Sequence, residues 1–420
     1  MDTAPTGKNI VVCCDGTGNE VEGNLSNVLK LFRIATKSPQ QRVYYHPGVG
    51  TIASQDQWTR LKQNARSVFG LATGYGLDDD ILAAYRYLGE QYEPGDQVFL
   101  FGFSRGAYTV RALAGFIHMV GLLPVDQLNV ADYALTAYKR ASEENDFNLA
   151  WDFSRIMGGR RTTIKFVGVW DTVSTMIVPR RDRILPTLRT LPYTRTNPSV
   201  AVFRHAMAID ERRRMFRLNR WTPAQKFVAN PFDTAAVPQA QDIKQVWFAG
   251  VHSDVGGGYP ETESALSKFP LSWMIDEATA HGLKINAAMR NHLVLGQPRA
   301  GSKHTYVAPD AGGMLHNSLT AGWWPLEWLP KSAKWMEWKR TQMLGHYIPD
   351  AEPRVIAPSQ EAQPPVATDP PVKPRIHQSV LDRMAKLPDY KPVNMPAQPT
   401  EYDVEPWHAP GETPQPGTEA

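Results

Sequence analysis

The chain has 420 residues, of which 42% are hydrophobic, enough for one large α/β domain with insertions or for two smaller domains. Its 45 Lys and Arg nearly balance its 42 Asp and Glu, and the net charge of +3 gives no indication of a nucleic-acid partner. The only two cysteines, Cys13 and Cys14, are adjacent, which excludes a zinc-ribbon site and a disulfide framework and suits a reducing compartment.

No stretch of the sequence approaches the roughly 20 apolar residues of a membrane-spanning helix. The polar residues 1–8 and the short apolar run over 10–14 also lack the apolar core of a signal peptide. We therefore expect a protein that is cytoplasmic as synthesised. It would reach another compartment only by a signal-independent secretion system.

The first hundred residues alternate between strand and helix patterns. Apolar runs predict strands over 8–14 and 42–45, and apolar residues at helical spacing predict helices over 26–35 and 78–92. This alternation predicts an α/β fold with a doubly wound, mostly parallel sheet.

The central feature of the sequence is the pentapeptide Gly102-Phe103-Ser104-Arg105-Gly106. An apolar strand pattern runs directly into it, and a helical pattern begins at Ala107. Strand, sharp turn and helix are the context of a nucleophile elbow, in which Gly102 and Gly106 leave room for the strained turn and Ser104 is the nucleophile. The alternative is an ordinary strand-to-helix turn in which Ser104 only caps the helix.

Two further strand patterns end in residues that complete a catalytic triad. The strand over 161–170 ends at Asp171, and the strand over 245–251 ends at His252. Ligands of open α/β sheets bind at the carboxyl ends of the strands, where Ser104, Asp171 and His252 would all lie. The chain order Ser, Asp, His is that of α/β-hydrolases, so we expect an α/β-hydrolase-like fold. His316 is an alternative base, and His252 is favoured because it follows a strand directly.

The oxyanion hole of such a site takes one N–H from the residue after the nucleophile and one from a loop after an earlier strand. The first donor would be Arg105, and the second would be Gly16 or Thr17. An ordinary turn closed by Asp15 is the alternative for this loop. The same residues resemble the opening of haloacid-dehalogenase phosphatases, but those enzymes need an Asp where this chain has Cys13, so that interpretation is disfavoured.

Three further features concern the rim of the site. An Arg-rich insertion over 174–244 has a helix-like piece over 200–216 that contains Arg212 and Arg213, and it either attracts an anionic substrate or is a solvated basic face. The segment 319–340 contains five Trp, Trp323 and Trp324 among them, interleaved with Lys and Arg. It is either an interfacial segment for peripheral membrane contact or a packed part of the fold.

Asp254 either binds calcium or caps its loop; we expect no other metal ligand and no cofactor.

Proline becomes frequent after residue 346, and Pro-rich stretches do not hold regular structure. We therefore divide the chain into a catalytic domain over 8–346, a Pro-rich loop or linker over 347–375, a short segment over 376–395 that returns to the domain, and a disordered tail over 396–420.

Six ordered motifs between about residues 8 and 395 together resemble an uncharacterised α/β-hydrolase domain family that includes type VI secretion phospholipase effectors of the Tle1-like kind. The resemblance implies Ser104 as nucleophile, Asp171 as acid and His252 as base, with phospholipase A-type hydrolysis in the effector branch. It also implies contact with a secretion apparatus or an immunity partner. The motifs are 14–19, 102–107, 168–173, 205–213, 251–259 and 376–380.

We therefore expect a serine hydrolase that cleaves carboxylic esters, with acyl esters of a phospholipid or related lipid as the favoured substrates. Two alternatives stay open. One is a hydrolase of soluble esters or thioesters, and the other is a non-catalytic α/β-hydrolase-fold protein that binds a membrane or a partner.

Overall fold

A computed structural model of the chain describes residues 7–16, 24–48, 76–144, 148–173, 177–178, 187–188, 191–229, 237–320, 322–333, 336–357 and 372–408. Its centre is an eight-stranded sheet in which every neighbouring pair of strands is parallel. The strands are β1 (Asn9–Cys14), β2 (Gln41–His46), β3 (Gln97–Phe103), β4 (Ile164–Trp170), β7 (Val200–Ala208), β10 (Asp242–Phe248), β13 (Arg375–His377) and β14 (Asp403–Glu405).

The order of the strands across the sheet is β2-β1-β3-β4-β7-β10-β13-β14. The chain moves outward from β1 to β2 and then continues on the other side of β1 from β3 onward. The direction of winding therefore changes between β1 and β3, and such a switch point opens a crevice at the carboxyl ends of the two strands. Gly16 follows β1 and Ser104 follows β3, so both predicted site segments lie at this crevice.

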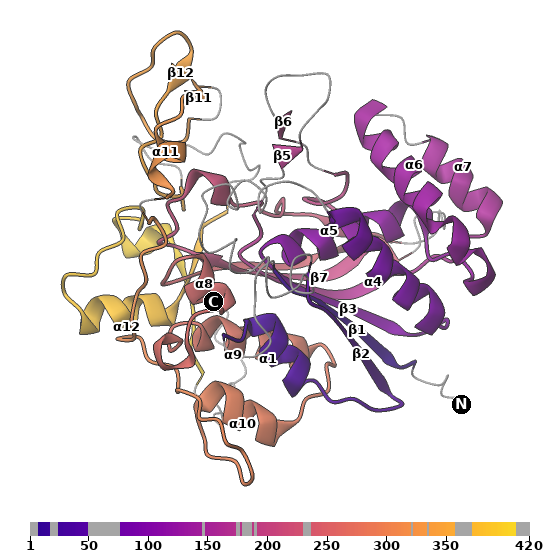
Figure 1. The fold of residues 1–420 in the computed structure, drawn as a ribbon, viewed down its shortest axis with the longest axis horizontal. Helices are drawn as coiled ribbons and strands as arrows, with labels where there is room; N and C mark the ends of the chain where they lie inside the picture. The colour runs from indigo at the N-terminus through magenta and orange to yellow at the C-terminus, as the bar shows by residue number, and fades with distance from the viewer. Residues whose placement is uncertain are drawn as a thin grey trace.

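Helices cover both faces of the sheet (Figure 1), as a doubly wound fold requires. One face carries α4 (Leu77–Gln91), α5 (Arg105–Val120), α6 (Ala131–Glu144) and α7 (Asn148–Met157). The other carries α1 (Asn27–Ile34), α9 (Lys268–Ala280) and α10 (Ala287–Leu295). The remaining helices are α8 (His252–Gly256), α11 (Trp324–Glu327) and α12 (Gln378–Lys386). No described helix is both long and apolar enough to cross a membrane.

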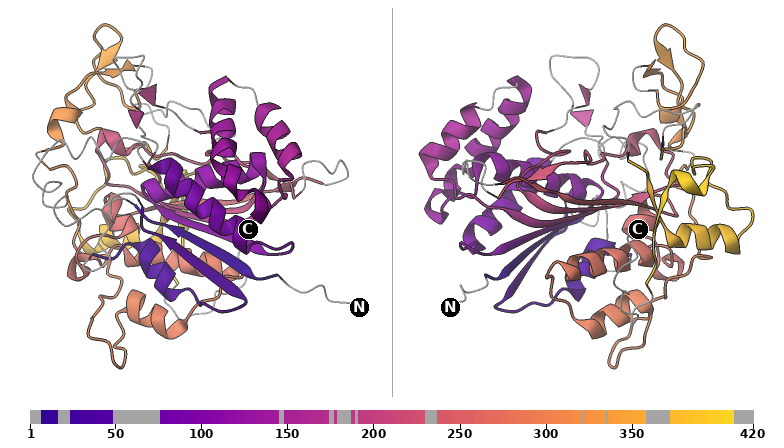
Figure 2. Two further views of the ribbon diagram at one scale, coloured as in Figure 1. Left: turned by 45° about the vertical axis from the view of Figure 1, so that its right-hand side comes forward. Right: turned by 180° about the vertical axis from the view of Figure 1, so that it is seen from behind.

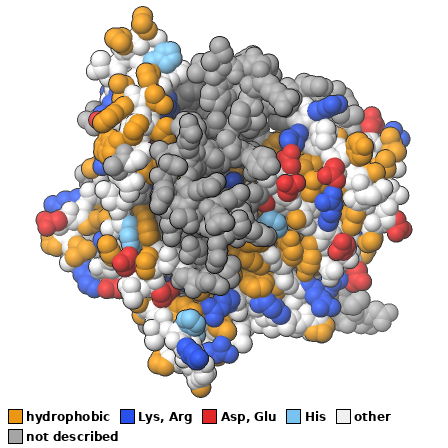
Figure 3. Space-filling model, viewed as in Figure 1, with side chains coloured by type: hydrophobic (Ala, Val, Ile, Leu, Met, Phe, Trp, Pro, Cys, Tyr) orange, Lys and Arg blue, Asp and Glu red, His pale blue; other side chains and the backbone are white. Residues whose placement is uncertain are grey.

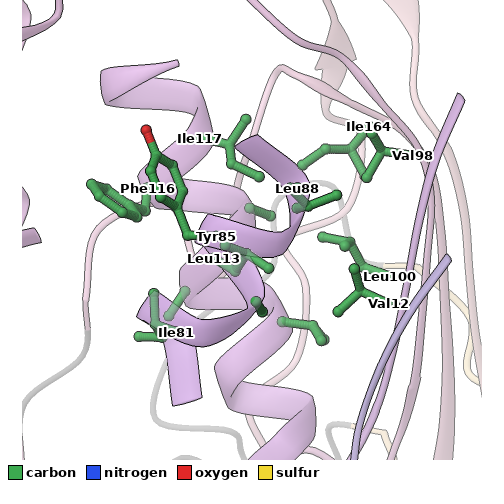
Figure 4. Close-up of a cluster of buried hydrophobic side chains, with 14 of the residues drawn as sticks. Val12, Ile81, Tyr85, Leu88, Val98, Leu100, Leu113, Phe116, Ile117 and Ile164 are labelled. Carbon is green, nitrogen blue, oxygen red and sulfur yellow. The ribbon is translucent and has the colours of Figure 1, made fainter. Parts of the chain in front are cut away.

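Alternation along the strands divides the core into two layers. In β1, Ile10 and Val12 pack under α4 and α5, whereas Val11 and Cys13 face α1 and α9. Figure 4 shows the first layer, in which Tyr85 of α4 and Phe116 of α5 lie together above the sheet; their ring centroids are 4.3 Å apart. Because both faces are buried, the central strands β1, β3 and β4 are apolar along most of their length.

The predicted insertion over 174–244 differs from the structure. Its expected helix-like piece over 200–216 begins instead with β7, the strand between β4 and β10. Arg204 gives this stretch a basic, helix-like appearance, but its guanidinium is buried and pairs with Asp242 of β10 and Glu277 of α9. The segment therefore contributes to the centre of the sheet as well as to its surroundings.

The C-terminal part of the chain is more ordered than its proline content indicates. The first half of the expected tail contains β14, which pairs in parallel with β13 and forms the edge of the sheet; Figure 2 shows this yellow segment along that edge. Residues 347–357, expected as the start of a linker, include buried Tyr347, Val355 and Ile356. Proline excludes helix and inner strand, but it permits extended chain that packs through its other side chains. Residues 358–371 and 409–420 lie outside the described residues.

We predict that Gly106→Ala destabilises the protein by about 2 kcal/mol or more, because helix α5 lies against the end of β1. A Cβ on Gly106 would be 2.1 Å from the carbonyl oxygen of Cys14 and 2.5 Å from that of Asp15. Both contacts are with backbone, which cannot turn aside as a side chain can. Guanidinium unfolding of the variant measures the effect.

Gly322→Ala is the matched control, because a Cβ on Gly322 would meet nothing within 4 Å. An equal loss of stability in the two variants would contradict the close approach of α5 to β1.

Candidate active site

Ser104 lies in a strained turn between β3 and α5. Its backbone has φ 56° and ψ −119°, a conformation that a residue with a side chain seldom adopts and that costs roughly 1–3 kcal/mol. Although Ser104 stands at the N-cap position of α5, its side chain makes no capping hydrogen bond. It is partly exposed, whereas Phe103 and Arg105 on either side are buried. The alternative interpretation, a simple capping serine, therefore does not describe this residue.

Three glycines permit the close packing around the turn. A Cβ on Gly102 would lie 2.4 Å from the carbonyl oxygen of Gly106, so the turn closes only because position 102 has no side chain. A Cβ on Gly16 would lie 3.2 Å from the Cβ of Ser104. The loop after β1 therefore approaches the predicted nucleophile directly, as expected at the switch point.

Asp171 and His252 form a buried hydrogen-bonded pair. Asp171 follows β4 with φ 41°, and its N–H donates to the carbonyl oxygen of Ala206 on β7. The Nδ1 of His252, the first residue of α8, lies 2.6 Å from Asp171 Oδ2. Because Nδ1 faces the carboxylate, Nε2 points away from it and is the nitrogen available for proton transfer.

Aromatic packing brings His252 to the end of the nucleophile strand. The Phe103 ring lies 4.7 Å from the imidazole between centroids, and a Cβ on Gly256, at the end of α8, would be 1.9 Å from Phe103. The hydrogen bonds of the described residues do not include one between the side chains of Ser104 and His252. The structure therefore joins Asp171 to His252 by a hydrogen bond and places His252 against the residue that precedes Ser104.

The residue that the sequence analysis missed is Arg354. Its Nη1 donates to Asp171 Oδ1 over 2.6 Å, and its Nη2 donates to Asp171 Oδ2 over 2.9 Å. Burial alone would raise the pKa of Asp171, but the charges and hydrogen bonds of Arg354 and His252 bring that pKa well below its usual range. Arg354 stands in a Pro-rich stretch without a motif, so no local signal marks it.

A second acidic residue, Glu211, holds the backbone of α8. Its Oε2 accepts from the His252 N–H over 3.1 Å, and both of its oxygens accept from Arg213, over 2.9 and 2.8 Å. Burial raises the pKa of Glu211, but the contacts with Arg213 lower it to about 2. Burial lowers the pKa of His252, and Asp171 offsets only part of that effect. His252 is therefore neutral at pH 7.

The expected rim residues have specific contacts. Arg213 lies 3.6 Å from the ring centroid of Phe216, which in turn lies 4.8 Å from His252 and 5.5 Å from Trp323. The guanidinium of Arg213 is thus occupied by Glu211 and Phe216. The remaining two residues lie further out: the Nε of exposed Arg212 donates to the carbonyl oxygen of Ala351, and Trp324 packs 6.0 Å from Trp328.

The two predicted sources of the oxyanion hole differ in what they offer. Arg105 is the first residue of α5, so its N–H lies at the positive end of the helix dipole. The N–H of Gly16 donates to Asp15 Oδ1 over 2.7 Å. This contact is the one expected of the alternative for this loop, an ordinary turn closed by Asp15. Thr17 lies outside the described residues.

Asp254 and His316 form a separate cluster beside α8. Asp254 Oδ2 accepts from the N–H of Val251, and its Oδ1 lies 2.6 Å from His316 Nδ1. His316 Nε2 lies 3.1 Å from Glu263, so both ring nitrogens of this alternative base face carboxylates rather than Ser104. These contacts give Asp254 a role in capping its loop, and the described residues contain no group of three His, Cys, Asp or Glu side chains arranged to hold a metal ion.

Comparisons with known proteins identify relatives of this chain. A family model described as "T6SS, Phospholipase effector Tle1-like, catalytic domain" matches residues 8–277. The uncharacterized protein YEL023C of Saccharomyces cerevisiae (strain ATCC 204508 / S288c) is 33% identical over 233 residues, which are 52% of this chain and 33% of the yeast protein. The chain thus spans about a third of the length of that relative.

Two solved structures are also similar to this chain. One is an uncharacterized protein from Pseudomonas aeruginosa, with a TM-score of 0.36 and 20% identity over 68% of this chain and 47% of that one. The other is the Tle1 effector bound to the VgrG spike from the Type 6 secretion system, with a TM-score of 0.31 and 19% identity over 62% and 53%. The family model alone covers more than half of the chain. The chain therefore belongs to the family of type VI secretion phospholipase effectors with a Tle1-like catalytic domain.

Proposed function

We propose that this protein is a serine hydrolase that cleaves carboxylic esters of phospholipids as a type VI secretion effector. The observation that carries the proposal is the strained, partly exposed Ser104 between two strand ends, beside a buried Asp171–His252 pair. Family membership supports the choice of phospholipid. It likewise supports contacts with the secretion apparatus and with an immunity partner. The reaction requires no cofactor.

In the proposed reaction, Ser104 Oγ attacks the ester carbonyl while His252 Nε2 takes the hydroxyl proton. Asp171 accepts the Nδ1–H of His252 and stabilises the imidazolium that forms. The leaving alcohol then takes the proton from His252, and water hydrolyses the acyl-enzyme by the same steps. A hydrogen bond between catalytic Ser and His often tightens only when substrate is bound, which fits its absence between these side chains.

The negative charge on the carbonyl oxygen needs donors, and each donor of an oxyanion hole contributes about 3–4 kcal/mol in other enzymes. The N–H of Arg105 is one proposed donor, helped by the dipole of α5. The second would come from the loop after β1. Since the Gly16 N–H is directed to Asp15, Thr17 is the better candidate within that loop.

A projecting arm supports peripheral membrane contact and hence a lipid substrate over a soluble ester. This arm, residues 322–333 and 336–348, contains α11 and the pair β11 (Lys331–Ser332) and β12 (His346–Tyr347), and it extends away from the sheet in Figures 1 and 2. Figure 3 shows hydrophobic side chains gathered on it. Its exposed large apolar residues are Trp328, Leu329, Met343, Leu344 and Ile348.

The charge and position of the arm fit a lipid surface. Lys339 and Arg340 are exposed between its apolar residues, as in interfacial segments with cationic anchors. At its base, Trp323 contacts Phe216, which contacts the imidazole of His252. The docking surface would therefore adjoin the site where the ester is cleaved.

We predict that a fluorophosphonate forms a single covalent adduct with the wild-type protein and none with Ser104→Ala, because only an activated serine attacks the reagent. Intact-mass analysis measures the adduct. Ester hydrolysis should fall by at least about 10³-fold in the same variant.

Ser38→Ala is the control, since Ser38 precedes β2 at the opposite end of the sheet. An adduct that persists in Ser104→Ala, or folded wild-type protein that forms none, would contradict the proposed nucleophile and favour a binding protein.

We predict that the double variant Trp328→Ser, Leu344→Ser binds anionic phospholipid vesicles at least about 10-fold more weakly than the wild type. Burial of one such side chain contributes roughly 1.5–3 kcal/mol, so partial insertion of two suffices for this loss. Hydrolysis of a short-chain monomeric ester should be unchanged. Vesicle flotation and initial rates measure the two effects.

Tyr133→Ser on α6, which removes an aromatic ring that is 72% exposed, is the matched control. If wild-type protein shows no increase in rate when the ester passes from monomers to micelles, the soluble-ester alternative replaces the lipid substrate.

A further inference from the structure

The carboxylate of the predicted catalytic acid has a second cationic partner besides the histidine. Asp171 is fully buried, and each of its carboxylate oxygens accepts a hydrogen bond from one nitrogen of the Arg354 guanidinium. Oδ1 also accepts from the N–H of Ala208, and Oδ2 also faces Nδ1 of His252. The Asp171 carboxylate is therefore shared between an arginine, which contacts both oxygens, and the imidazole of His252, which contacts one.

Arg354 is itself held in one orientation. It is 4% exposed, and besides its contacts with Asp171 it donates to the carbonyl oxygens of Ala208 and Phe216, over 3.0 and 2.6 Å. Its own carbonyl oxygen accepts from the side-chain amide of Asn394, over 2.9 Å. A planar guanidinium fixed on both sides in this way defines the plane of the carboxylate that it binds.

The position of Arg354 in the chain makes this contact informative. The family model ends at residue 277, and Arg354 comes from the packed stretch over 347–357 that follows the arm. A residue outside the matched region thus contacts the acid of the proposed triad inside it.

We propose that Arg354 is a positioning residue of the triad, which orients the Asp171 carboxylate toward His252 and lowers the pH at which His252 becomes an active base. The proposal rests on the proposed function, since it assigns His252 as the base. In a simple triad, the carboxylate directs its full negative charge to the imidazole and favours its protonated form. Here a permanent cation neutralises much of that charge, so the imidazolium gains less from Asp171.

The other charged groups around the imidazole are themselves paired. Glu211 and Arg213, in the loop after β7, face His252 with opposite charges and form a bidentate pair. On its own helix, Asp254 is engaged with His316. His205 of β7 lies behind Asp171 and accepts from the N–H of Thr172, so it is neutral. Arg354 is therefore the cation in direct contact with the carboxylate that His252 faces.

The proton balance of the reaction follows from these contacts. Ser104 loses its proton to Nε2 of His252, and the Nδ1 proton stays on the imidazole and is donated to Asp171. Asp171 does not take up the proton, because Arg354 stabilises its ionised form. The proton is then given from Nε2 to the leaving alcohol.

The decisive experiment is an NMR titration of the His252 imidazole in Ser104→Ala protein, with and without Arg354→Gln. Arg354→Gln should raise the midpoint of the His252 titration by about one pH unit or more, because removal of a nearby cation favours the protonated ring. This readout needs no catalysis, so it tests the inference even if the protein has no esterase activity.

The kinetic counterpart uses protein with the native Ser104. In Arg354→Gln the acid limb of kcat/KM should move to higher pH by the same amount, and kcat per folded molecule should fall about 10-fold while KM changes little. Arg354→Lys keeps the charge but loses one contact, so its acid limb should stay in place while kcat falls. If Arg354→Gln does not fold, the fall in kcat of Arg354→Lys still tests whether Arg354 positions Asp171.

Arg204→Gln is the matched control, because Arg204 is a buried arginine with a bidentate carboxylate partner, Asp242, on the same sheet. It should lower the melting temperature and leave the pH profile unchanged. The inference is overturned if Arg354→Gln behaves like Arg204→Gln, with an unshifted His252 titration, or if Arg354→Lys retains full kcat. If the wild-type protein hydrolyses no ester, the proposed function is refuted instead.

Discussion

The buried carboxylate of Asp171 is the interaction on which the rest of the site depends. A charged carboxylate in the core costs several kcal/mol unless donors surround it. Its donors come from β7, from α8 and from the stretch over 347–357, through Ala208, His252 and Arg354. Three segments that are far apart in the sequence must therefore assemble before the acid is stable. The Asp171–His252 pair therefore depends on the assembled sheet.

The parallel sheet explains why these segments meet. Every neighbouring pair of strands in the sheet is parallel, so the carboxyl ends of the strands lie on the same side. The loops that leave from these ends carry Gly16, Ser104, Asp171, Glu211 and His252. The winding changes direction between β1 and β3, and the strained Ser104 lies at that point. The strain is tolerated because Gly102, Gly106 and Gly16 let three backbone segments approach within contact distance. Helix α5, buried along its whole length, holds the turn in place.

The residues that could be predicted from the sequence are those with a local signal. Ser104, Asp171 and His252 each follow an apolar run of strand length, and the helices over 26–35 and 78–92 have clear periodicity. The sequence predicts a helix-like piece where the structure has β7. Arg204 and His205, which are buried in the sheet, resemble the polar face of a helix when only the sequence is considered. Arg354 and β14 carry no local signal at all. Their structure comes from tertiary contacts, which a Pro-rich composition does not reveal.

The region that the family model matches is not the whole folding unit of this chain. It ends in α9, before β13, β14 and Arg354. Without the later residues, β10 would be an edge strand, and the cluster formed by Met207, Trp247, Ile376 and Val380 would lose its covering side. Asp171 would also lose Arg354 and retain a buried charge with fewer donors. Removal of one partner from a buried ion pair costs roughly 3–5 kcal/mol, a large part of a typical stability of 5–15 kcal/mol. The C-terminal stretch therefore contributes to the fold and to the candidate active site through the same contacts.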